Sequence, residues 1–410
     1  MEPVDVVVVG AGLAGLRAAQ VLEGAGQSVR LFDAAPEVGG RLASRVLDGY
    51  VLDVGFQVVN ALYPELVATG VGVDLDHRRF ESALRYVGPG GFDVVDPRVD
   101  LRAALAGLSA SHQSRLDLAR FAALLAACAW RPASSIRRGG DRSSAEALER
   151  RGISAAFVAD VVQPFLRGTL LDDELVTSWR YVQFVLRSFV RGCPGTYPTG
   201  VVALPRALAS RLRATIVHLG EPVRAVRADR VATDVATYPC RHVLVATDPW
   251  RARELVGVAP VPSRAQTSWW FDAPAVHGGG RLRLDLERRF LTSALDVAAV
   301  ASERAPRGRS LLVAAANGEH DDDADGAVRD DVARLYDLDR ADVTLLERTV
   351  VARALAAAPA PLSLSRPSRW GDVFVAGDYC QTPSIQGALV SGRRAATALL
   401  QSHGVSPIPE

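Results

Sequence analysis

The pattern of apolar and polar positions predicts alternating strands and helices at both ends of the chain. Residues 4–9 are apolar except for Asp5, as in a strand buried on both faces. The helical pattern LRAAQVLEGAG follows, and the run SVRLFDA then predicts a second strand. Residues 373–377 predict another buried strand, and a helix rich in small residues begins near Ser384. These units indicate an α/β domain assembled from distant parts of the sequence.

The middle of the chain follows a different pattern. Residues 100–130 and 144–190 carry apolar positions at helical spacing, whereas residues 261–315 alternate as strands do. The second pattern predicts an antiparallel sheet with one solvated face. Four arginines are expected on that face: Arg281, Arg283, Arg288 and Arg289. The acidic run EHDDDADGAVRDD is expected to form a solvated loop and the start of a helix.

Composition narrows the class of protein. A chain of 410 residues suits two or three domains, and 49% hydrophobic with 23% charged residues indicates a globular fold. The net charge of +1, without a basic stripe, argues against a nucleic-acid partner. Four scattered cysteines lack metal or dithiol spacing, so no metal site is expected. The N-terminal apolar run is interrupted by glycines and has no basic leader, so we expect neither a signal peptide nor a membrane span, and a cytoplasmic location.

A glycine-rich loop joins the first strand to the first helix. It reads Gly10-Ala11-Gly12-Leu13-Ala14-Gly15, which is G-x-G-x-x-G in the strand-to-helix context that binds dinucleotides. Gly10 allows the tight turn, Gly12 allows close approach to a pyrophosphate, and Gly15 allows the helix to pack on the strand. The helix N-terminus, with Leu13 and Ala14, supplies positive potential. Asp33 stands twenty-one positions after Gly12, where an acid binds a ribose 2′-hydroxyl.

The segment PEVGGRLASR indicates which dinucleotide is bound. Gly39-Gly40-Arg41 places a second turn and a fixed cation behind the ribose acid, and an arginine can make a bidentate contact with a pyrophosphate. Together with the glycine loop, this start resembles the FAD-binding start of the amine oxidase and phytoene desaturase superfamily. The resemblance implies FAD rather than a nicotinamide cofactor, with a discontinuous Rossmann-like FAD-binding domain and an inserted α+β substrate domain.

The resemblance also implies site residues further along the chain. Asp53-Val54-Gly55 is similar to a superfamily segment that runs beside the flavin ring, which would place Gly55, Phe56 and Gln57 near the isoalloxazine. Gln57 is the one candidate for a catalytic contact, and it reads equally well as an ordinary polar residue. The strand around Val223 is expected to contact the adenine end through its backbone.

The C-terminal segment VFVAGDYCQTPSIQGALVSG supplies the rest of the expected cofactor site. It is similar to a run in plant-type phytoene and zeta-carotene desaturases. The resemblance implies that Gly377 approaches the pyrophosphate and that Asp378 accepts a hydrogen bond from a ribityl hydroxyl. The helix that begins at Ser384-Ile385-Gln386 is expected to face the flavin N1–C2=O edge. Cys380 is placed near the ribityl chain, so we expect FAD to be bound non-covalently.

These assignments predict a chain that crosses between two domains. Residues 1–75, 195–260 and 355–410 are assigned to the FAD-binding domain, and residues 76–194 and 261–354 to the substrate-binding domain. A second G-x-G-x-x-G is absent from the sequence, so a separate NADPH domain is not expected.

The expected reaction is transfer of a hydride from a substrate to flavin N5. The sequence contains no lysine, whereas typical amine oxidases of this superfamily hold a water against N5 with one. We therefore expect C–C or C–N dehydrogenation of a largely apolar small molecule, with oxygen or a quinone-type carrier as electron acceptor. Peripheral contact with a membrane is compatible with this reading. The alternatives are a flavin amine oxidase that produces hydrogen peroxide, and a non-redox binding protein of the GDP-dissociation-inhibitor type.

Overall fold

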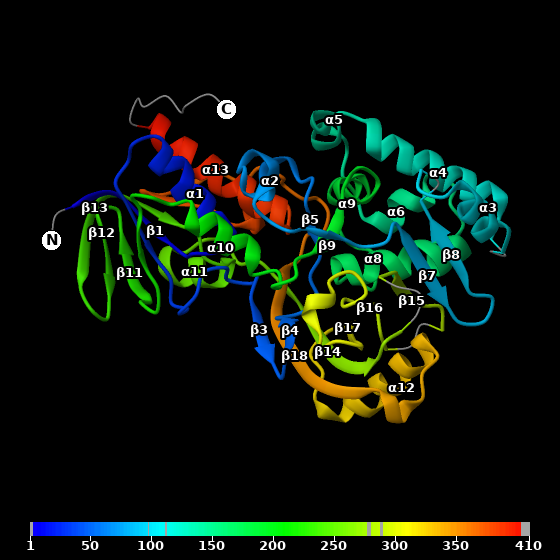
Figure 1. Cartoon of the computed structure of the whole chain (residues 1–410). Coiled ribbons are helices and arrows are strands. Elements are labelled where there is room, and N and C mark those ends of the chain that lie inside the picture. Colours follow the sequence, from blue (N-terminus) through cyan, green and yellow to red (C-terminus); the bar gives the residue numbers. More distant parts are fainter. Residues whose placement is uncertain (1–2, 97, 111–112, 277–279, 288–289, 403–410) are drawn as a thin grey trace.

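The structure is a computed structural model, which describes residues 3–96, 98–110, 113–276, 280–287 and 290–402. Two large sheets form the centres of two parts that lie side by side (Figure 1). The first sheet takes its strands from residues 4–32, 216–245 and 369–375, and the second from residues 83–95 and 263–356. The fold is therefore mixed α/β, with each part assembled from separate stretches of sequence. The exact domain boundaries given above stay a prediction.

The first sheet has the order β10-β2-β1-β13-β12-β11, with β20 beside β13 and β19 beside β20. Its parallel core pairs β1 with β2 and β13, and β13 with β20. The bounds are β1 Val4–Val9, β2 Val29–Phe32, β10 Ile216–His218, β11 Val223–Arg227, β12 Arg230–Thr233, β13 Thr237–Val245, β19 Arg369–Trp370 and β20 Val373–Val375.

Two helices from opposite ends of the chain cover this sheet together. Helix α1 spans Leu13–Gly24 and helix α13 spans Ile385–Gln401. A Cβ atom on Gly392 of α13 would lie 2.1 Å from the Ala14 carbonyl oxygen, so the two helix backbones nearly touch. The two helices lie side by side in Figure 1. Their contact brings the N-terminal glycine loop next to the C-terminal segment.

The second sheet has the order β18-β14-β17-β16-β15-β7-β8. All neighbours are antiparallel except β15 and β7, which run parallel. The bounds are β7 Ala83–Val87, β8 Phe92–Val95, β14 Ser263–Pro274, β15 Leu282–Asp285, β16 Ser293–Asp296, β17 Arg309–Asn317 and β18 Thr344–Ala356. The antiparallel prediction for residues 261–315 is thus confirmed in its main strands.

The predicted solvated face is wrong for the centre of this sheet, because both of its faces are covered. Helix α12, Asp325–Tyr336, packs Val328 and Val332 against Trp269, while Trp270 faces a second cluster that contains Leu52. The acidic run before α12 does form a short 3-10 turn, Asp322–Ala324, and the helix start, as expected.

The four arginines expected on the solvated face have different outcomes. Arg283 is not on a wet face, because its guanidinium lies 4.1 Å from the Tyr336 ring centroid. Arg281 is partly exposed and pairs with Glu81 and Asp93. Arg288 and Arg289 lie outside the described residues.

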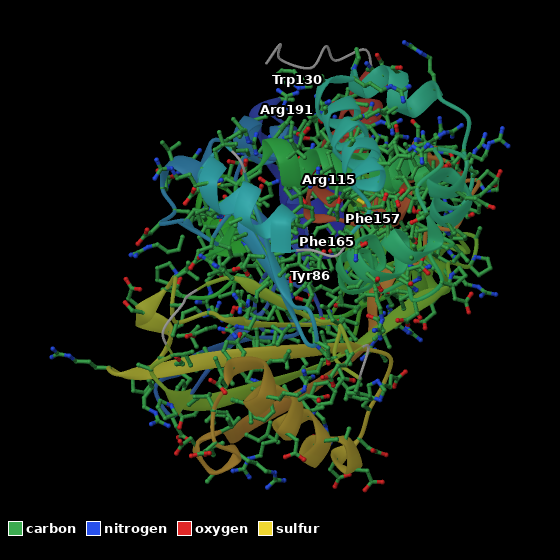
Figure 2. The ribbon with its side chains drawn as sticks, turned by 90° about the vertical axis from the view of Figure 1, so that its right-hand side faces the viewer. Tyr86, Arg115, Trp130, Phe157, Phe165 and Arg191 are labelled. Carbon is green, nitrogen blue, oxygen red and sulfur yellow. The ribbon has the colours of Figure 1, made fainter. Side chains whose placement is uncertain are left out.

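The helices predicted in residues 100–130 and 144–190 are present and pack beside the second sheet. Serine side chains cap four of them: Ser114, Ser143, Ser154 and Ser178. Phe157 and Phe165 lie within this helical region, and Tyr86 of β7 donates its hydroxyl to the Val161 carbonyl oxygen there (Figure 2). Arg191 lies over Trp130 near the edge of the region. The bounds are α3 Leu101–Ala110, α4 Arg115–Trp130, α5 Ala133–Arg138, α6 Ser144–Glu149, α7 Ala155–Phe157, a π-helix Val158–Val162, α8 Gln163–Leu170 and α9 Trp179–Arg191.

The remaining short elements lie beside the first sheet or between the two sheets. Their bounds are β3 Ser44–Leu47, β4 Tyr50–Asp53, β5 Val59–Asn60, α2 Pro64–Ala68, β6 Arg78–Arg79, β9 Pro194–Thr196, α10 Ala203–Ser210 and α11 Pro249–Val256. A buried ion pair joins the end of β4 to the turn that precedes β17. Arg304 Nη1 lies 2.9 Å from Asp53 Oδ2, and the two side chains are 0% and 3% exposed. Among the described residues, no helix is both long enough and apolar enough to cross a membrane.

Candidate cofactor and substrate site

The glycine loop after β1 leaves an open cradle at Gly12. Gly10 adopts φ +108°, and a Cβ atom there would lie 2.8 Å from the Ala246 carbonyl oxygen, so the turn requires glycine. A Cβ atom on Gly15 would lie 1.8 Å from the Gly10 carbonyl oxygen. In contrast, a Cβ atom on Gly12 would meet nothing within 4 Å. No side chain caps α1 at Gly12, so the helix N-terminus points its backbone donors at this open space.

Asp33 lies directly after β2 and is fixed beside the glycine loop. Its Oδ2 accepts a hydrogen bond of 2.6 Å from the Ala11 N–H, and its Oδ1 accepts one of 2.8 Å from the Ala35 N–H. A carboxylate offers about four acceptor sites, so acceptor capacity remains for a further hydroxyl. The Glu221 N–H donates to the Asp33 carbonyl oxygen at 2.9 Å, which places the start of β11, and hence Val223, near this acid.

The second glycine turn faces the first across the cradle. The Gly39 N–H donates to the Ala11 carbonyl oxygen at 2.9 Å, and Gly39 forms an isolated parallel bridge with Gly12. A Cβ atom on Gly40 would lie 3.6 Å from the Gly12 Cα atom. The two turns therefore enclose one narrow space, which additional side-chain carbon would fill.

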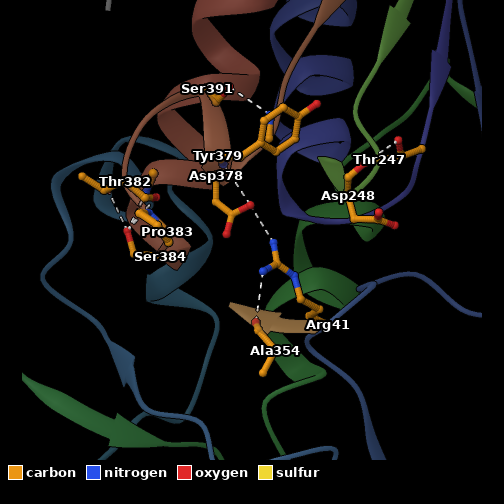
Figure 3. Close-up of polar contacts among 12 residues, drawn as sticks. Arg41, Thr247, Asp248, Ala354, Asp378, Tyr379, Thr382, Pro383, Ser384 and Ser391 are labelled. Atoms are coloured by element: carbon orange, nitrogen blue, oxygen red, sulfur yellow. Dashed lines mark hydrogen bonds and ion pairs between the residues drawn. The ribbon is translucent and has the colours of Figure 1, made fainter. Parts of the chain in front are cut away.

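Arg41 links the second turn to the C-terminal segment. Its Nη2 lies 2.7 Å from Asp378 Oδ1, and its Nη1 donates to the Ala354 carbonyl oxygen at 3.2 Å (Figure 3). The Asp378 side chain is only 4% exposed, and the charge of this carboxylate raises the pKa of Arg41. The pair was not anticipated from the sequence, which assigned the two residues to different contacts.

The C-terminal segment is a tightly fitted turn before α13. Gly377 is close to the Tyr379 ring, which would lie 2.2 Å from a Cβ atom at that position. Its N–H donates to Ser391 Oγ at 3.0 Å. Ser384 caps α13 by accepting a hydrogen bond from the Gly387 N–H at 3.0 Å, and Ile385 begins the helix.

The side chains of Gln386 and Cys380 in this segment make contacts within the protein or are buried. Gln386 Oε1 accepts a hydrogen bond of 3.1 Å from the Glu65 N–H, so it fastens α13 to α2. Cys380 is buried without a disulfide, and burial raises the pKa of its thiol to about 11. The thiol is therefore protonated at neutral pH.

Gly55, Phe56 and Gln57 lie at the junction with the second sheet. Gly55 has φ +84°, and its Cβ position would be 3.4 Å from Gln266 Oε1 and 3.6 Å from Val351 Cγ2. The Phe56 N–H donates to Gln266 Oε1 at 3.2 Å. Glycine is required here by the backbone conformation and not by a close contact.

The Gln57 side chain is occupied by the backbone. Its Nε2 donates to the carbonyl oxygens of Arg41 at 2.6 Å and Val54 at 3.0 Å. These contacts use both amide hydrogens and hold the Arg41 turn against the strand that ends at Asp53. The geometry favours the ordinary structural reading of Gln57 over a catalytic one.

Gln266 was missed by sequence reasoning. It lies on β14, is 8% exposed and carries the amide oxygen nearest to Gly55. The only sequence signal is a polar residue inside an otherwise strand-like run, AQTSWWF. Its place opposite Gly55 depends on a contact between residues more than two hundred positions apart, which a local pattern does not contain.

Two tyrosines that the sequence analysis did not assign to the site border the turn before α13. Tyr181 of α9 donates its hydroxyl to the Pro383 carbonyl oxygen at 2.6 Å. Burial raises the pKa of Tyr63 to about 12, and it raises the pKa of Tyr181 further, with Tyr63 and Asp378 as neighbours that add to the effect. Both phenols are therefore neutral at physiological pH. We refer to residues 10–15, 39–42, 53–57, 351–354 and 377–386, with Asp33, Tyr63, Tyr181 and Gln266, as the cofactor seam.

Comparison with known proteins identifies the family. Residues 13–400 match the family of flavin containing amine oxidoreductases. The chain belongs to this family. The predicted superfamily, the α/β fold class and the assignment as an FAD-dependent oxidoreductase are thereby confirmed.

Individual relatives are similar over limited stretches. Putrescine oxidase of Kocuria rosea is 42% identical over 89 residues, which cover 21% of this chain and 19% of that protein. Protoporphyrinogen oxidase 2, chloroplastic/mitochondrial, of Arabidopsis thaliana is 28% identical over 174 residues, or 41% of this chain and 33% of that protein. The chain thus matches a third or less of the length of these relatives.

Solved structures share the fold over nearly the whole chain. An oxidoreductase from Methanosarcina mazei has a TM-score of 0.73 at 16% identity, covering 95% of this chain and 99% of that one. A putrescine oxidase bound to putrescine has a TM-score of 0.71 at 17% identity, covering 98% and 99%. At these identities the likeness shows the fold and does not assign a substrate.

Proposed function

We propose that this protein holds one FAD non-covalently in the cofactor seam and oxidises a largely apolar small molecule by C–C or C–N dehydrogenation. When bound, the flavin supplies the hydride acceptor at N5. The protein supplies the binding, the orientation and the exclusion of water. The observation that carries the cofactor assignment is the open cradle at Gly12, enclosed by two glycine turns and by the N-terminus of α1.

The cradle has the chemistry that a dinucleotide needs. We assign Gly10, Gly12, Leu13, Ala14 and Gly15 to the pyrophosphate, because a helix N-terminus with no side-chain cap favours an anion. The second turn and Gly377 approach the same space: Gly39, Gly40 and Gly377.

Acidic and polar groups would orient the rest of the cofactor. Asp33 keeps acceptor sites for a ribose hydroxyl, with Val223 at the adenine end. Asp378 would accept a hydrogen bond from a ribityl hydroxyl, and its carboxylate also forms the ion pair with Arg41. We assign the α13 N-terminus, Ser384-Ile385-Gln386, to the flavin N1–C2=O edge.

Non-covalent binding is supported by the state of Cys380. A thiolate is the reactive form of cysteine, and burial holds the pKa of this thiol at about 11. The group is therefore unsuited to attack a flavin.

The proposed substrate class is supported by neutral groups of the seam, on β14, on β18 and beside the turn before α13. Gln266 carries an uncharged amide, Val351 is apolar, and Tyr63 and Tyr181 are protonated. A neutral, largely apolar molecule can enter such a site without leaving a charge unpaired.

The nearby carboxylates are already paired. Asp378 binds Arg41, and Asp172 lies 3.2 Å from Arg264 Nη2. A protonated amine would have to displace one of these arginines, which disfavours a cationic substrate. The second candidate is an amine oxidase that produces hydrogen peroxide, which the likeness to putrescine oxidase favours.

Anaerobic reduction separates the two candidates. Flavin-loaded protein is mixed without oxygen with pairs of compounds that share a carbon skeleton, one neutral and one a primary amine, while absorbance near about 450 nm is followed. We expect bleaching by neutral members alone. Faster bleaching by the amines, with peroxide formed once air is admitted, would contradict the proposal. Reoxidation by oxygen compared with a quinone then identifies the electron acceptor.

A further inference from the structure

A hollow lined by arginines lies in the helical region, outside the cofactor seam. It has a volume of about 410 Å³ and lies among the ends of α4, α5 and α6 and the first turns of α9. Its main lining side chains are Arg131, Arg142, Arg150, Arg151, Trp179 and Gln183. We call it the arginine pocket. None of these residues belongs to the cofactor seam, and the volume lies in the range of small-molecule sites.

The positive charge of the arginine pocket is poorly compensated. Within the described part of the chain, the carboxylate that pairs with these guanidinium groups is Glu146, whose Oε1 lies 3.4 Å from Arg142 Nη1 and 3.7 Å from Arg150 Nη1. The nearby Asp141 accepts hydrogen bonds from Ser178 Oγ and from the backbone N–H groups of Arg142 and Arg180. One half-exposed carboxylate cannot neutralise four guanidinium groups.

The other two arginines of the pocket contact neutral oxygens. Arg131 donates to Gln183 Oε1 at 3.2 Å, and Arg151 donates to the Ala147 carbonyl oxygen at 2.6 Å. Burial lowers the pKa of Arg151, and the charges of Arg142 and Arg131 lower it further. The cations therefore repel each other across the hollow, and an anion between them would relieve that repulsion.

Trp179 forms part of the pocket wall, and its indole N–H is sealed from solvent. The residue lines the pocket and is only 3% exposed, yet its Nε1–H has no acceptor among the described residues. A buried donor without a partner costs about 1–3 kcal/mol, so such groups are rare.

The surroundings hold Trp179 rigidly in place. Its backbone N–H donates to the Arg142 carbonyl oxygen at 2.9 Å, and the Arg151 guanidinium lies 4.5 Å from the centroid of its ring. The Trp179 ring and the Arg151 guanidinium are thus held together at the wall of the pocket.

We propose that the arginine pocket binds a small organic polyanion that carries at least two phosphate or carboxylate groups. Guanidinium groups bind such oxyanions with paired, charge-assisted hydrogen bonds, and four of them can hold two anionic groups at once. The site is separate from the proposed redox function and does not depend on it.

Helix α9 contributes to both sites. Trp179 lines the pocket, whereas Tyr181 contacts the Pro383 carbonyl oxygen in the cofactor seam. The two sites therefore share one rigid element, although they share no lining residue.

Isothermal titration calorimetry on the flavin-loaded full chain tests the proposal. The probes are inorganic pyrophosphate and citrate, at an ionic strength of about 0.15 M so that weak surface binding is screened. The flavin stays in place during the titration, as its absorbance verifies, so pyrophosphate cannot enter the cradle at Gly12. We expect saturable binding of at least one probe. Tighter binding of pyrophosphate identifies a phosphate ligand, and tighter binding of citrate identifies a polycarboxylate.

Matched variants distinguish the pocket from the general charge of the protein. The double variant Arg142→Gln/Arg151→Gln should bind at least about tenfold more weakly, because each substitution removes a charge-assisted contact. The control Arg253→Gln/Arg307→Gln removes the same charge at two exposed positions outside the pocket and should bind like the wild type. Equal weakening in both double variants, or no saturable binding by the wild type, would overturn the proposal.

Two single variants protect the test against misfolding. Arg150 is 65% exposed, so Arg150→Gln should fold normally and still weaken binding. Arg131 also lines the pocket and is exposed, so Arg131→Gln should likewise fold normally and weaken binding, because it removes one charge-assisted contact. Unchanged affinity in both would contradict the proposal.

Discussion

Alanine at Gly12 should separate cofactor binding from folding. The added Cβ atom meets nothing within 4 Å in the protein, and the residue has φ −74°, which alanine adopts readily. The cost to the FAD-free protein is that of replacing a glycine N-cap by alanine, about 0.5–1 kcal/mol. The same methyl group would occupy the space assigned to the pyrophosphate. Overpacking of this kind costs about 1–3 kcal/mol, so FAD affinity should fall by a factor of about 5 to 150.

Two neighbouring substitutions are the controls. Gly15→Ala places a Cβ atom 1.8 Å from the Gly10 carbonyl oxygen, so it should lower both stability and FAD affinity, by more than about 3 kcal/mol in stability. Gly24→Ala lies on the same helix in open space and should leave both unchanged or raise stability slightly.

Thermal unfolding of the FAD-free proteins and fluorescence titration with FAD give the two quantities separately. Wild-type FAD affinity in Gly12→Ala would refute the assignment of the cradle. A loss of stability as large as that of Gly15→Ala would refute the reading of the space as open.

Three further predictions concern buried or partly buried ionisable side chains. Asp378→Ala should lose FAD on dialysis with little change in the melting temperature of the FAD-free protein, and full retention of flavin would contradict the role given to Asp378. Arg304→Met leaves Asp53 buried and unpaired, so unfolding in urea should show a loss of about 3–5 kcal/mol, and a loss below about 1 kcal/mol would refute that reading. Burial lowers the pKa of His77, so the contribution of neutral His77 to stability is present above the unfolded pKa of about 6.5 and is lost as pH falls through the folded pKa. The melting temperatures measured at about pH 5 and about pH 7.5 should therefore differ less in His77→Gln than in the wild type. An equal difference in the two proteins would contradict this role of His77.

The parts of the fold that the sequence predicts are those with local signals. The strand, glycine loop and helix at residues 4–24 form one continuous pattern, and β1, β2 and α1 appear where that pattern places them. The prediction of a solvated face on the second sheet was wrong because α12, which begins about fifty residues after the end of β14, covers that face. The burial of a strand depends on the element that packs against it, and alternation within the strand does not reveal that element.

The site residues also divide into those that a local sequence pattern reveals and those that only the folded structure brings together. The glycine turns and Asp33 are read from spacing, because a dinucleotide cradle is built from one short stretch. Gln266 and Tyr181 reach the cofactor seam from β14 and α9, through contacts between distant residues. The pairing of Arg41 with Asp378 likewise joins residues more than three hundred positions apart. Such contacts follow from the topology, which no single motif contains.

The flavin content of the purified protein tests the central claim most directly. The protein should carry about one FAD per chain, with absorbance near about 450 nm, and acid denaturation should release all of it into the supernatant. Flavin that stays with the precipitated chain would contradict non-covalent binding. A colourless protein that takes up no added FAD would contradict the cofactor assignment and favour a binding protein without redox chemistry.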